Sequence, residues 1–393
     1  MTDHQQGGVS PEIDLVKRAL AHYQGRSTDM ADTVMEQPVS AYIDPERYRL
    51  EVDRIFRSLP LALCLSIELP KPGSYLAMEV ADVPVLLVRG DDGVARAFLN
   101  ICRHRGAPVC AAGKGEATVF SCPYHAWTYG RDGTLRGIYA ERTFGPVEKE
   151  GLSLHELPSA ECAGLVFVGL KREATFDIED WLGDFREELE TLDLGTWHVY
   201  AQRTFDGPGW KVAWDGYLEA YHHNPIHGET VGKYTIGNLL LQDVYGPHQR
   251  ITFARKSLKD IVDVPANAWD PDQHIRKIHS VFPNLSISGI LGDHCLVSQV
   301  FPGPTPTTTT TRQTVLCAKV PETEAEREAS ETFSQLVRQA VVDEDYAIGQ
   351  KIQDTLKTDA SETFLYGRNE PALQHYHSQV ARFAGTAPPR PRA

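Results

Sequence analysis

Short hydrophobic runs separated by turn residues fill the stretch from about residue 42 to residue 170. Tyr75–Val80 and Val83–Val88 are two such runs, and the turn sequence RDG at 131–133 separates two more, with a glycine that tolerates positive φ. The apolar run Gly164–Leu170 has the composition of a buried strand that closes a sheet. This pattern predicts a small antiparallel β-domain.

The pattern becomes mixed after residue 170. The predicted helices are Asp180–Leu194, Trp214–His223 and Glu322–Leu356, and the predicted strands lie in Ile236–Thr252 and Ser280–Phe301. A short apolar-periodic piece near the N-terminus predicts a helical arm, and the proline-rich end APPRPRA predicts a disordered or extended tail. We therefore expect the α+β class for the chain as a whole.

The composition argues against several partners and compartments. The 393 residues include 53 acidic and 39 basic side chains, and the formal net charge of −14 argues against a nucleic-acid or anionic-membrane partner. No apolar run approaches the roughly 20 residues that span a bilayer, and the N-terminus lacks the pattern of a secretory signal. Seven cysteines at scattered spacings favour a reducing cytoplasm in which some thiolates bind metal.

Two pairs of metal-binding side chains lie in the β-rich part. The first pair, C-x-H, is Cys102 and His104. After seventeen intervening residues follows the second pair, C-x2-H, which is Cys122 and His125. One thiolate and one imidazole from each of two loops suit a [2Fe–2S] cluster in which two histidines bind one iron and raise the reduction potential. Structural zinc sites more often pair cysteine with cysteine, and buried side chains without a metal are the other alternative. We favour an iron–sulfur cluster, which carries electrons.

A second group of acids and histidines lies around residue 220. If 214–223 is a helix, Asp215, Glu219 and His222 share one face of it, at steps of four and three residues. The proline two residues before His227 should end that helix, so that a turn brings His227 to the same metal as His222. Two imidazoles and one carboxylate leave positions open for oxygen on an Fe(II) ion. The same residues also fit the polar face of an ordinary surface helix.

The segments AFLNICRHRGAPV and FSCPYHAWTYGRDGTLRG closely resemble the Rieske domain of the Rieske non-heme iron oxygenases, α-subunit type. In that family the C-x-H and C-x2-H pairs hold the [2Fe–2S] cluster, and the resemblance assigns this role to the four residues above. Ala126 stands where the family usually has glycine, and we expect a negative φ there. The pair Leu59-Pro60 replaces a common tryptophan, and neither change affects a ligand.

The segment that begins at Trp210 resembles the iron motif of the same family. The resemblance makes His222 and His227 ligands of a mononuclear Fe(II) ion and leaves His223 without a role. It places Glu219 at the position of an acid, more often aspartate, that connects the two metal centres. Asp215, one helical turn earlier in the predicted helix, is then a candidate residue that orients the ligands without binding the metal itself.

The third iron ligand is expected far along the chain. The acid-rich segment VVDEDYAIGQKIQ resembles the family's C-terminal ligand helix, with Asp345 at the ligand position. Asp343 and Glu344 are its rivals, because three adjacent acids allow an error of register. The later segment TFLYGRNEPALQHYH also resembles the family, and there His375 and His377 are interpreted as structural or surface residues.

The resemblance also implies the domain organisation. A Rieske β-domain at 42–170 would be joined to a catalytic domain of the helix-grip type, an antiparallel sheet with helices, at 171–385. An N-terminal helical arm at 1–41 and a disordered tail at 386–393 would complete the chain. In this family subunits form a head-to-tail ring, most often an α3 trimer, sometimes with a β subunit. By analogy His125 of one subunit would contact Glu219 of the next.

The implied function is that of a terminal oxygenase, which uses O2 to hydroxylate a small organic substrate, aromatic or cyclic. The chain carries no dinucleotide-binding fingerprint, so electrons from NAD(P)H would arrive through a separate reductase, with or without a ferredoxin. One alternative is a monooxygenase that acts as an O- or N-demethylase or on a quaternary ammonium compound. An alternative of another class is a Rieske electron carrier without oxygenase activity, which would leave the region of His222 and His227 unexplained.

Overall fold

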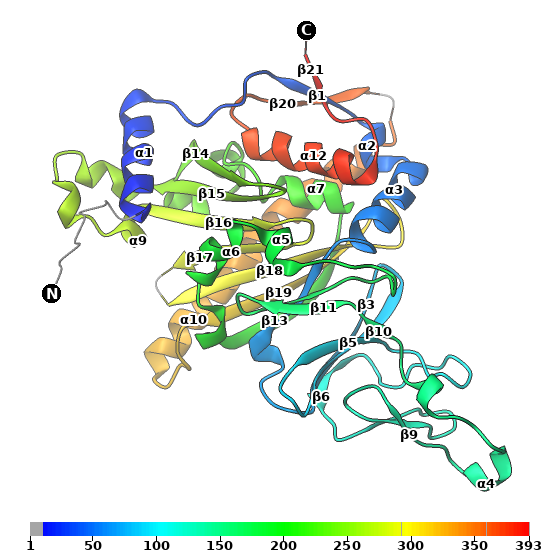
Figure 1. Cartoon of the computed structure of the whole chain (residues 1–393). Helices are drawn as coiled ribbons and strands as arrows, with labels where there is room; N and C mark the ends of the chain where they lie inside the picture. The colour runs from blue at the N-terminus through cyan, green and yellow to red at the C-terminus, as the bar shows by residue number, and fades with distance from the viewer. Residues whose placement is uncertain (1–10, 292, 359, 393) are drawn as a thin grey trace, which may run out of the picture.

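The computed structural model describes residues 11–392, with the exception of residues 292 and 359. Figure 1 shows a small β-domain at one end of a larger part in which helices surround a broad sheet. This mixture of antiparallel sheets and helices confirms the predicted α+β class. Within the described ranges, no helix has both the length and the apolar character needed to cross a membrane.

The small β-domain is antiparallel, as predicted. Its main sheet has the order β10-β5-β4-β3-β6, with the bounds Glu156–Leu157, Ala95–Leu99, Val83–Arg89, Ser74–Val80 and Gly113–Glu116. A second sheet comprises β7 (Phe120–Ser121), β8 (Thr128–Tyr129) and β9 (Leu135–Gly137). The apolar core of the domain includes Cys102 and Cys122, so both candidate thiolates lie inside it.

A third small sheet connects the β-domain to the rest of the chain. The predicted closing strand is confirmed as β12 (Leu165–Val168), which pairs with β11 (Ser159–Cys162) and β2 (Leu61–Leu65). All four side chains of β12 are buried. Two of them share a core with Phe185 and Ile287, which belong to the larger part, so the two parts have a common interior.

The larger part is built on a seven-stranded antiparallel sheet. Its order is β13-β19-β18-β17-β16-β15-β14, with the bounds His198–Gly207, Thr309–Cys317, His294–Pro302, Leu285–Leu291, Ile275–Val281, His248–Arg255 and Thr235–Tyr245. Side chains along β18 alternate between the two faces of the sheet, as the period of a strand requires. Leu296 packs against α10 (Glu324–Arg338), whereas Val297 packs with α6 (Phe185–Glu190) on the opposite face. Helices therefore cover both faces.

The two ends of the chain pack against this larger part. The predicted arm contains helix α1 (Pro11–Gly25), which buries its apolar stripe against β14, β15 and β16, while residues 1–10 lie outside the described residues. The tail, in contrast, is not disordered over 386–392. Its strand β21 (Arg390–Pro391) pairs with β1 (Met35–Pro38), because an edge strand offers free backbone groups even to a proline-rich partner.

The long helix predicted over Glu322–Leu356 is confirmed, with one irregularity that the sequence pattern did not reveal. Helix α10 begins with a capping box formed by Thr323 and Glu326, and α11 (Ala347–Thr355) continues the same rod. Between them, Gln339–Tyr346 is a π-helical segment. Such wider turns occur often at functional sites, and this one carries all three candidate acids.

The predicted helix 214–223 is wrong. Helix α7 (Trp210–Asp215) ends where Gly216 follows, residues 216–222 form turns, and a short helix α8 (His223–Ile226) comes next. Glycine loses more conformational freedom in a helix than other residues, so the chain leaves the helix at Gly216 at little cost. Pro225 does not end a helix here but lies in the first turn of α8, where its missing N–H is not needed.

The other predicted helix in this part, Asp180–Leu194, is divided. Helix α5 (Ile178–Leu182) ends at Gly183, which has a φ of 51°, and α6 follows it. The side chains Leu182, Phe185 and Leu189 are nevertheless buried on one side, as the helical period predicted.

Candidate metal centres

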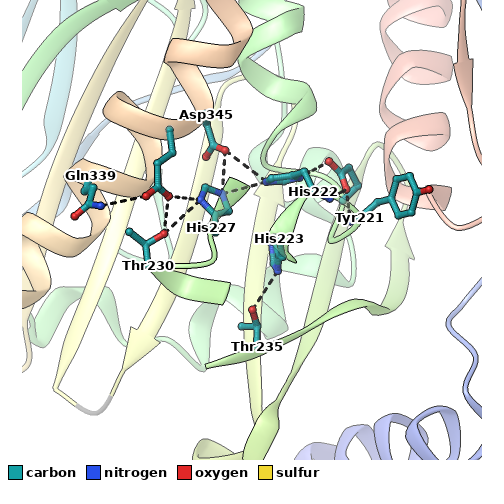
Figure 2. Close-up of polar contacts among 10 residues, drawn as sticks. Tyr221, His222, His223, His227, Thr230, Thr235, Gln339 and Asp345 are labelled. Atoms are coloured by element: carbon teal, nitrogen blue, oxygen red, sulfur yellow. Dashed lines mark hydrogen bonds and ion pairs between the residues drawn. The ribbon is translucent and has the colours of Figure 1, made fainter. Parts of the chain in front are cut away.

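His222, His227 and Asp345 converge, although Asp345 lies more than a hundred residues after the two histidines (Figure 2). One ligand atom from each of them lies within 4.8 Å of the other two. The Nε2 atoms of the two histidines are 3.2 Å apart, and Asp345 Oδ1 lies 2.9 Å from His227 Nε2 and 3.5 Å from His222 Nε2. Two imidazole nitrogens and one carboxylate oxygen therefore point at a common space. Such a donor set suits a non-heme Fe(II) ion with open positions.

The short helix α8 brings the two histidines together. His222 precedes its first residue and His227 follows its last, so one helical turn separates them. The backbone N–H of His227 donates to the carbonyl of His223, which closes this turn. Asp345 reaches the same point from the π-helical segment, whose wider turn displaces its side chain from the ordinary helical position.

A carboxylate holds the second ring nitrogen of each histidine. Glu219 contacts His222 Nδ1, and Glu344 Oε2 accepts a hydrogen bond of 2.6 Å from His227 Nδ1. Thr230 donates to the same oxygen of Glu344 at 2.6 Å, which fixes that carboxylate in turn. When Nδ1 carries the proton of a neutral ring, Nε2 is unprotonated and available to a metal. The chemistry of these residues therefore fits a mononuclear iron.

The three adjacent acids have three different environments. Asp343 pairs with Arg338 at 2.8 Å at the surface, and Glu344 is engaged by His227 Nδ1. Asp345 is the one whose carboxylate faces the Nε2 atoms of both histidines. The geometry therefore favours Asp345 over its two rivals as the third ligand. Glu344, which the sequence pattern offered only as a rival ligand, instead orients His227.

Asp215 and His223 are not part of the triad of His222, His227 and Asp345. Asp215 accepts hydrogen bonds from His377 Nε2 at 2.7 Å and from the hydroxyl of Tyr42 at 2.6 Å, so it belongs to a buried network behind α7. The predicted common face with Glu219 does not exist, because the helix ends at Asp215. His223 is buried beside Thr235, and burial lowers the pKa of His223 well below its usual value. His377 is fully buried, which agrees with its interpretation as structural.

The other candidate centre lies at the tip of the β-domain. Cys102 and Cys122 are 3% and 4% exposed, and the rings of His104 and His125 lie 4.7 Å apart between centroids. His104 also stacks on Trp127, with an interplanar angle of 8°. Two buried sulfurs and two adjacent imidazoles supply the donor set of a [2Fe–2S] cluster with mixed ligands.

The surroundings of these ligands would hold a cluster in a fixed orientation. Tyr129 lies with its hydroxyl 3.3 Å from Cys102 Sγ and accepts a hydrogen bond of 2.9 Å from the backbone N–H of Arg103. His125 is half-buried, and Arg105 Nη2 approaches its Nε2 at 3.0 Å. Cys110 packs at the edge of the same apolar core.

The two ligand loops share one backbone pattern. In the first, the N–H of Cys102 donates to the carbonyl of Ala107, and the N–H of Gly106 donates back to Cys102. In the second, Cys122 pairs in the same way with Trp127 and Ala126. Gly106 has a φ of 80° and Ala126 a φ of 54°, so the expected negative φ at Ala126 is wrong. The tight loop imposes a left-handed conformation whatever the side chain.

Replacing Ala126 with glycine should therefore stabilise the β-domain. A left-handed alanine is strained by roughly 1–2 kcal/mol, part of which glycine loses again through its freer unfolded chain. We expect the free energy of unfolding in urea, measured on the iron-loaded protein, to rise by up to about 1 kcal/mol. Ala111→Gly, at an exposed loop position without positive φ, is the control and should give no gain. A lower stability of Ala126→Gly would contradict the strain.

Two family models match the chain. The Rieske [2Fe-2S] domain matches residues 60–155, and the catalytic domain of the ring hydroxylating alpha subunit matches residues 194–386. The first match contains all four candidate cluster ligands. The second contains the candidate iron ligands and both carboxylates that hold them.

Curated relatives are oxygenase subunits. The glycine betaine monooxygenase oxygenase subunit of Pseudomonas aeruginosa is 30% identical over 242 residues, which is 60% of this chain and 53% of that protein. The carnitine monooxygenase oxygenase subunit of Acinetobacter pittii is 33% identical over 257 residues, 62% of this chain and 66% of that protein. The chain thus spans about half the length of the first of these relatives and about two thirds of the second.

Solved structures share the fold. A quaternary ammonium Rieske monooxygenase in complex with L-carnitine superposes with a TM-score of 0.76 at 23% identity, over 91% of this chain and 96% of that one. Naphthalene 1,2-dioxygenase superposes with a TM-score of 0.73 at 19% identity, over 89% of this chain and 92% of that one. With a Rieske domain, a ring-hydroxylating catalytic domain and this shared architecture, the chain belongs to the Rieske non-heme iron oxygenase α-subunits.

Proposed function

We propose that this protein is the terminal oxygenase component of a Rieske system. The single observation that carries the proposal is the convergence of His222, His227 and Asp345 in a chain that also has a Rieske domain. An electron carrier would need only the [2Fe–2S] cluster. The triad, held by carboxylates behind both imidazoles, is the part that an oxygenase requires.

Each residue has a defined role in the proposed reaction. Cys102, His104, Cys122 and His125 would hold the [2Fe–2S] cluster, and His222, His227 and Asp345 would hold the iron. When bound, the cluster would deliver electrons singly and the iron would use two of them with O2 to place oxygen in an organic substrate. Glu219 and Glu344 keep a proton on Nδ1 of each histidine, which fixes both rings. Apolar side chains around the triad limit the access of water.

Electron transfer would take place between subunits of a head-to-tail ring, most simply an α3 trimer. On the side of the triad that faces Glu219, a cavity of about 360 Å³ opens toward solvent and includes His222. Its rim carries the exposed apolar side chains Ile348 and Leu365, which suit contact with another subunit. His125 of the neighbouring β-domain would meet Glu219 there. A separate reductase, with or without a ferredoxin, would supply the electrons from NAD(P)H.

The substrate would be a small organic molecule. The similarity to the glycine betaine and carnitine monooxygenase subunits favours a monooxygenase that acts on quaternary ammonium compounds. Anthranilate and naphthalene dioxygenases are also similar, and they keep hydroxylation of an aromatic or cyclic compound as the second candidate.

The metal content separates an oxygenase from an electron carrier. We expect about three irons and two acid-labile sulfides per chain, two irons from the cluster and one from the triad. Iron and sulfide analysis of protein reconstituted without oxygen provides the measurement. A reproducible ratio of two irons to two sulfides would favour the carrier and contradict the oxygenase.

A further inference from the structure

A second cavity, of about 160 Å³, opens directly on the iron site and is lined by all three triad residues. One wall is the large sheet and the other consists of α8 and the π-helical rod. The cavity is mostly apolar, with Phe253, Ile278 and Leu296 on the sheet side. Pockets of this kind bind small molecules and use a few polar groups to orient them. The polar groups of the sheet wall therefore indicate what the substrate carries.

The strand register determines which side chains form this wall. Phe253 pairs with Arg276, and Ser288 pairs with both Ile278 and Leu296. Directly paired residues share a face, and so do residues two apart in one strand. Arg276 therefore lies on the apolar wall of the cavity.

Lys277, the next residue, also borders the cavity, but its ammonium group points the other way. Lys277 forms an ion pair of 2.9 Å with Glu12 of α1, and His279, two residues on, forms one of 2.8 Å with Glu188 of α6. Both pairs lie on the face of the sheet away from the triad. Arg276 is thus the guanidinium that this wall presents to the cavity.

Arg276 has no carboxylate partner within ion-pair distance in the part of the chain that the structure describes. Its Nη1 donates to the backbone carbonyls of Asp272 and Ile275, and its Nε is buried without a hydrogen-bond partner among the described residues. Burial, followed by the nearby charge of Arg255, lowers the pKa of Arg276 to about 10. Asp270 and Asp272 lie near enough to offset a part of this effect.

Arg250 and Arg312, two other arginines of the sheet, are neutralised by carboxylates, whereas Arg203 on β13 donates to neutral oxygens of Gln313 and Ser334. Arg250 pairs with Glu188 at 2.5 Å and Asp243 at 3.0 Å, and Arg312 pairs with Glu68. A desolvated cation without such a partner is costly, because it exchanges water for an apolar surrounding. The difference between Arg276 and the two neutralised arginines suggests that its partner is not part of the protein.

A second cation adds to the positive charge at this place. Arg255 lies on β15, two residues beyond the partner of Arg276, so both side chains project from the same face of the sheet. Burial lowers the pKa of Arg255 as well, and its Nη1 donates to the backbone carbonyl of Gln273 at 3.4 Å. Two adjacent arginines in a chain with a net charge of −14 form a local positive field that would attract an anion.

We propose that the substrate carries a carboxylate and that Arg276, in a positive field that Arg255 strengthens, binds this group and orients the rest of the molecule toward the iron site. A planar guanidinium pairs with a carboxylate through two parallel hydrogen bonds, which fix direction as well as position. A quaternary ammonium end, if the substrate has one, would lie away from the arginines, against the aromatic ring of Tyr217. This inference deepens the proposed function and rests on it.

Binding of matched pairs of probes tests the inference. γ-Butyrobetaine, glycine betaine, benzoate and phenylacetate would each be compared with its methyl ester by titration calorimetry on the iron-loaded protein, without oxygen or reductase. We expect at least one acid to bind about 10- to 100-fold more tightly than its ester, the range of a charge-assisted hydrogen-bond pair. Arg276→Gln should remove this preference and leave the ester within about threefold, and Arg276→Lys should retain part of it because lysine lacks the planar fork.

Several outcomes would overturn the inference. The first is that acids and their esters bind the unaltered protein equally tightly. The second is that Arg276→Gln weakens the binding of acids and esters to the same extent. The third is that no acid binds. Arg327→Gln, at an exposed position on α10, is the matched control for loss of a positive charge. Because binding is measured without turnover, a protein that binds acids but consumes no O2 would refute the oxygenase and keep the carboxylate site. If neutral compounds stimulated oxygen consumption as strongly as acids do, the carboxylate site would be refuted and the oxygenase kept.

Discussion

Replacing Glu219 with alanine is expected to lower turnover by at least about 100-fold, at the upper end of the losses seen when a residue that holds a metal-binding histidine is removed. The variant should still contain both metal centres once it is loaded with excess iron, because the side chains of all proposed ligands are unchanged. Glu219 contacts His222 Nδ1 and also accepts from the backbone N–H of His222 at 3.1 Å. It would thus be the carboxylate through which an electron from the neighbouring cluster reaches the iron ligand.

The control variants separate this role from general damage. Glu219→Gln keeps an oxygen that accepts from His222 Nδ1 but removes the charge, so we expect an intermediate loss. Glu229→Ala removes an exposed acid that pairs only with Lys233, and it should retain full activity. Reduction of the cluster by the reductase should proceed at the normal rate in every variant. Full turnover of iron-loaded Glu219→Ala would refute the bridge.

Replacing Asp345 with asparagine is expected to remove the mononuclear iron and nearly all oxygenase activity. The iron content should fall by about one per chain, whereas the visible spectrum of the [2Fe–2S] cluster should remain. The physical reason is the loss of the charged oxygen that faces both Nε2 atoms.

The neighbouring acids provide matched comparisons for this substitution. Glu344→Gln should weaken iron binding by about 10- to 100-fold, because Glu344 orients His227 without touching the metal. Asp343→Asn should bind iron normally, since its carboxylate pairs with Arg338 at the surface. Loss of iron in Asp343→Asn together with normal iron in Asp345→Asn would show that the assignment of the third ligand is wrong.

The β-domain and the candidate ligand residues could be predicted because the information is local. Alternating apolar runs with turn residues between them define antiparallel strands, and the two Cys/His pairs are short motifs. The apolar stripe of α1 and the long rod that carries Asp345 were visible for the same reason.

Other features depend on packing that a local pattern does not contain. The helix predicted over 214–223 failed because the periodicity of Asp215, Glu219 and His222 was compatible with a helix but did not require one. The π-helical turn and the role of Glu344 arise from contacts between segments more than a hundred residues apart. The positive φ of Ala126 could have been inferred by aligning its loop with the loop of Gly106, since each lies four residues after a ligand cysteine.

The measurement that tests the central claim most directly is the fate of O2. The iron-loaded protein, supplied with NADH through a surrogate reductase, would be screened against quaternary ammonium compounds, aromatic acids, polycyclic compounds and steroids under isotopically labelled O2. We predict substrate-stimulated consumption of NADH and O2 with label from O2 in the organic product, and loss of both in Asp345→Asn. Cluster reduction and reoxidation that no compound in the panel stimulates, and that Asp345→Asn leaves unchanged, would contradict the account.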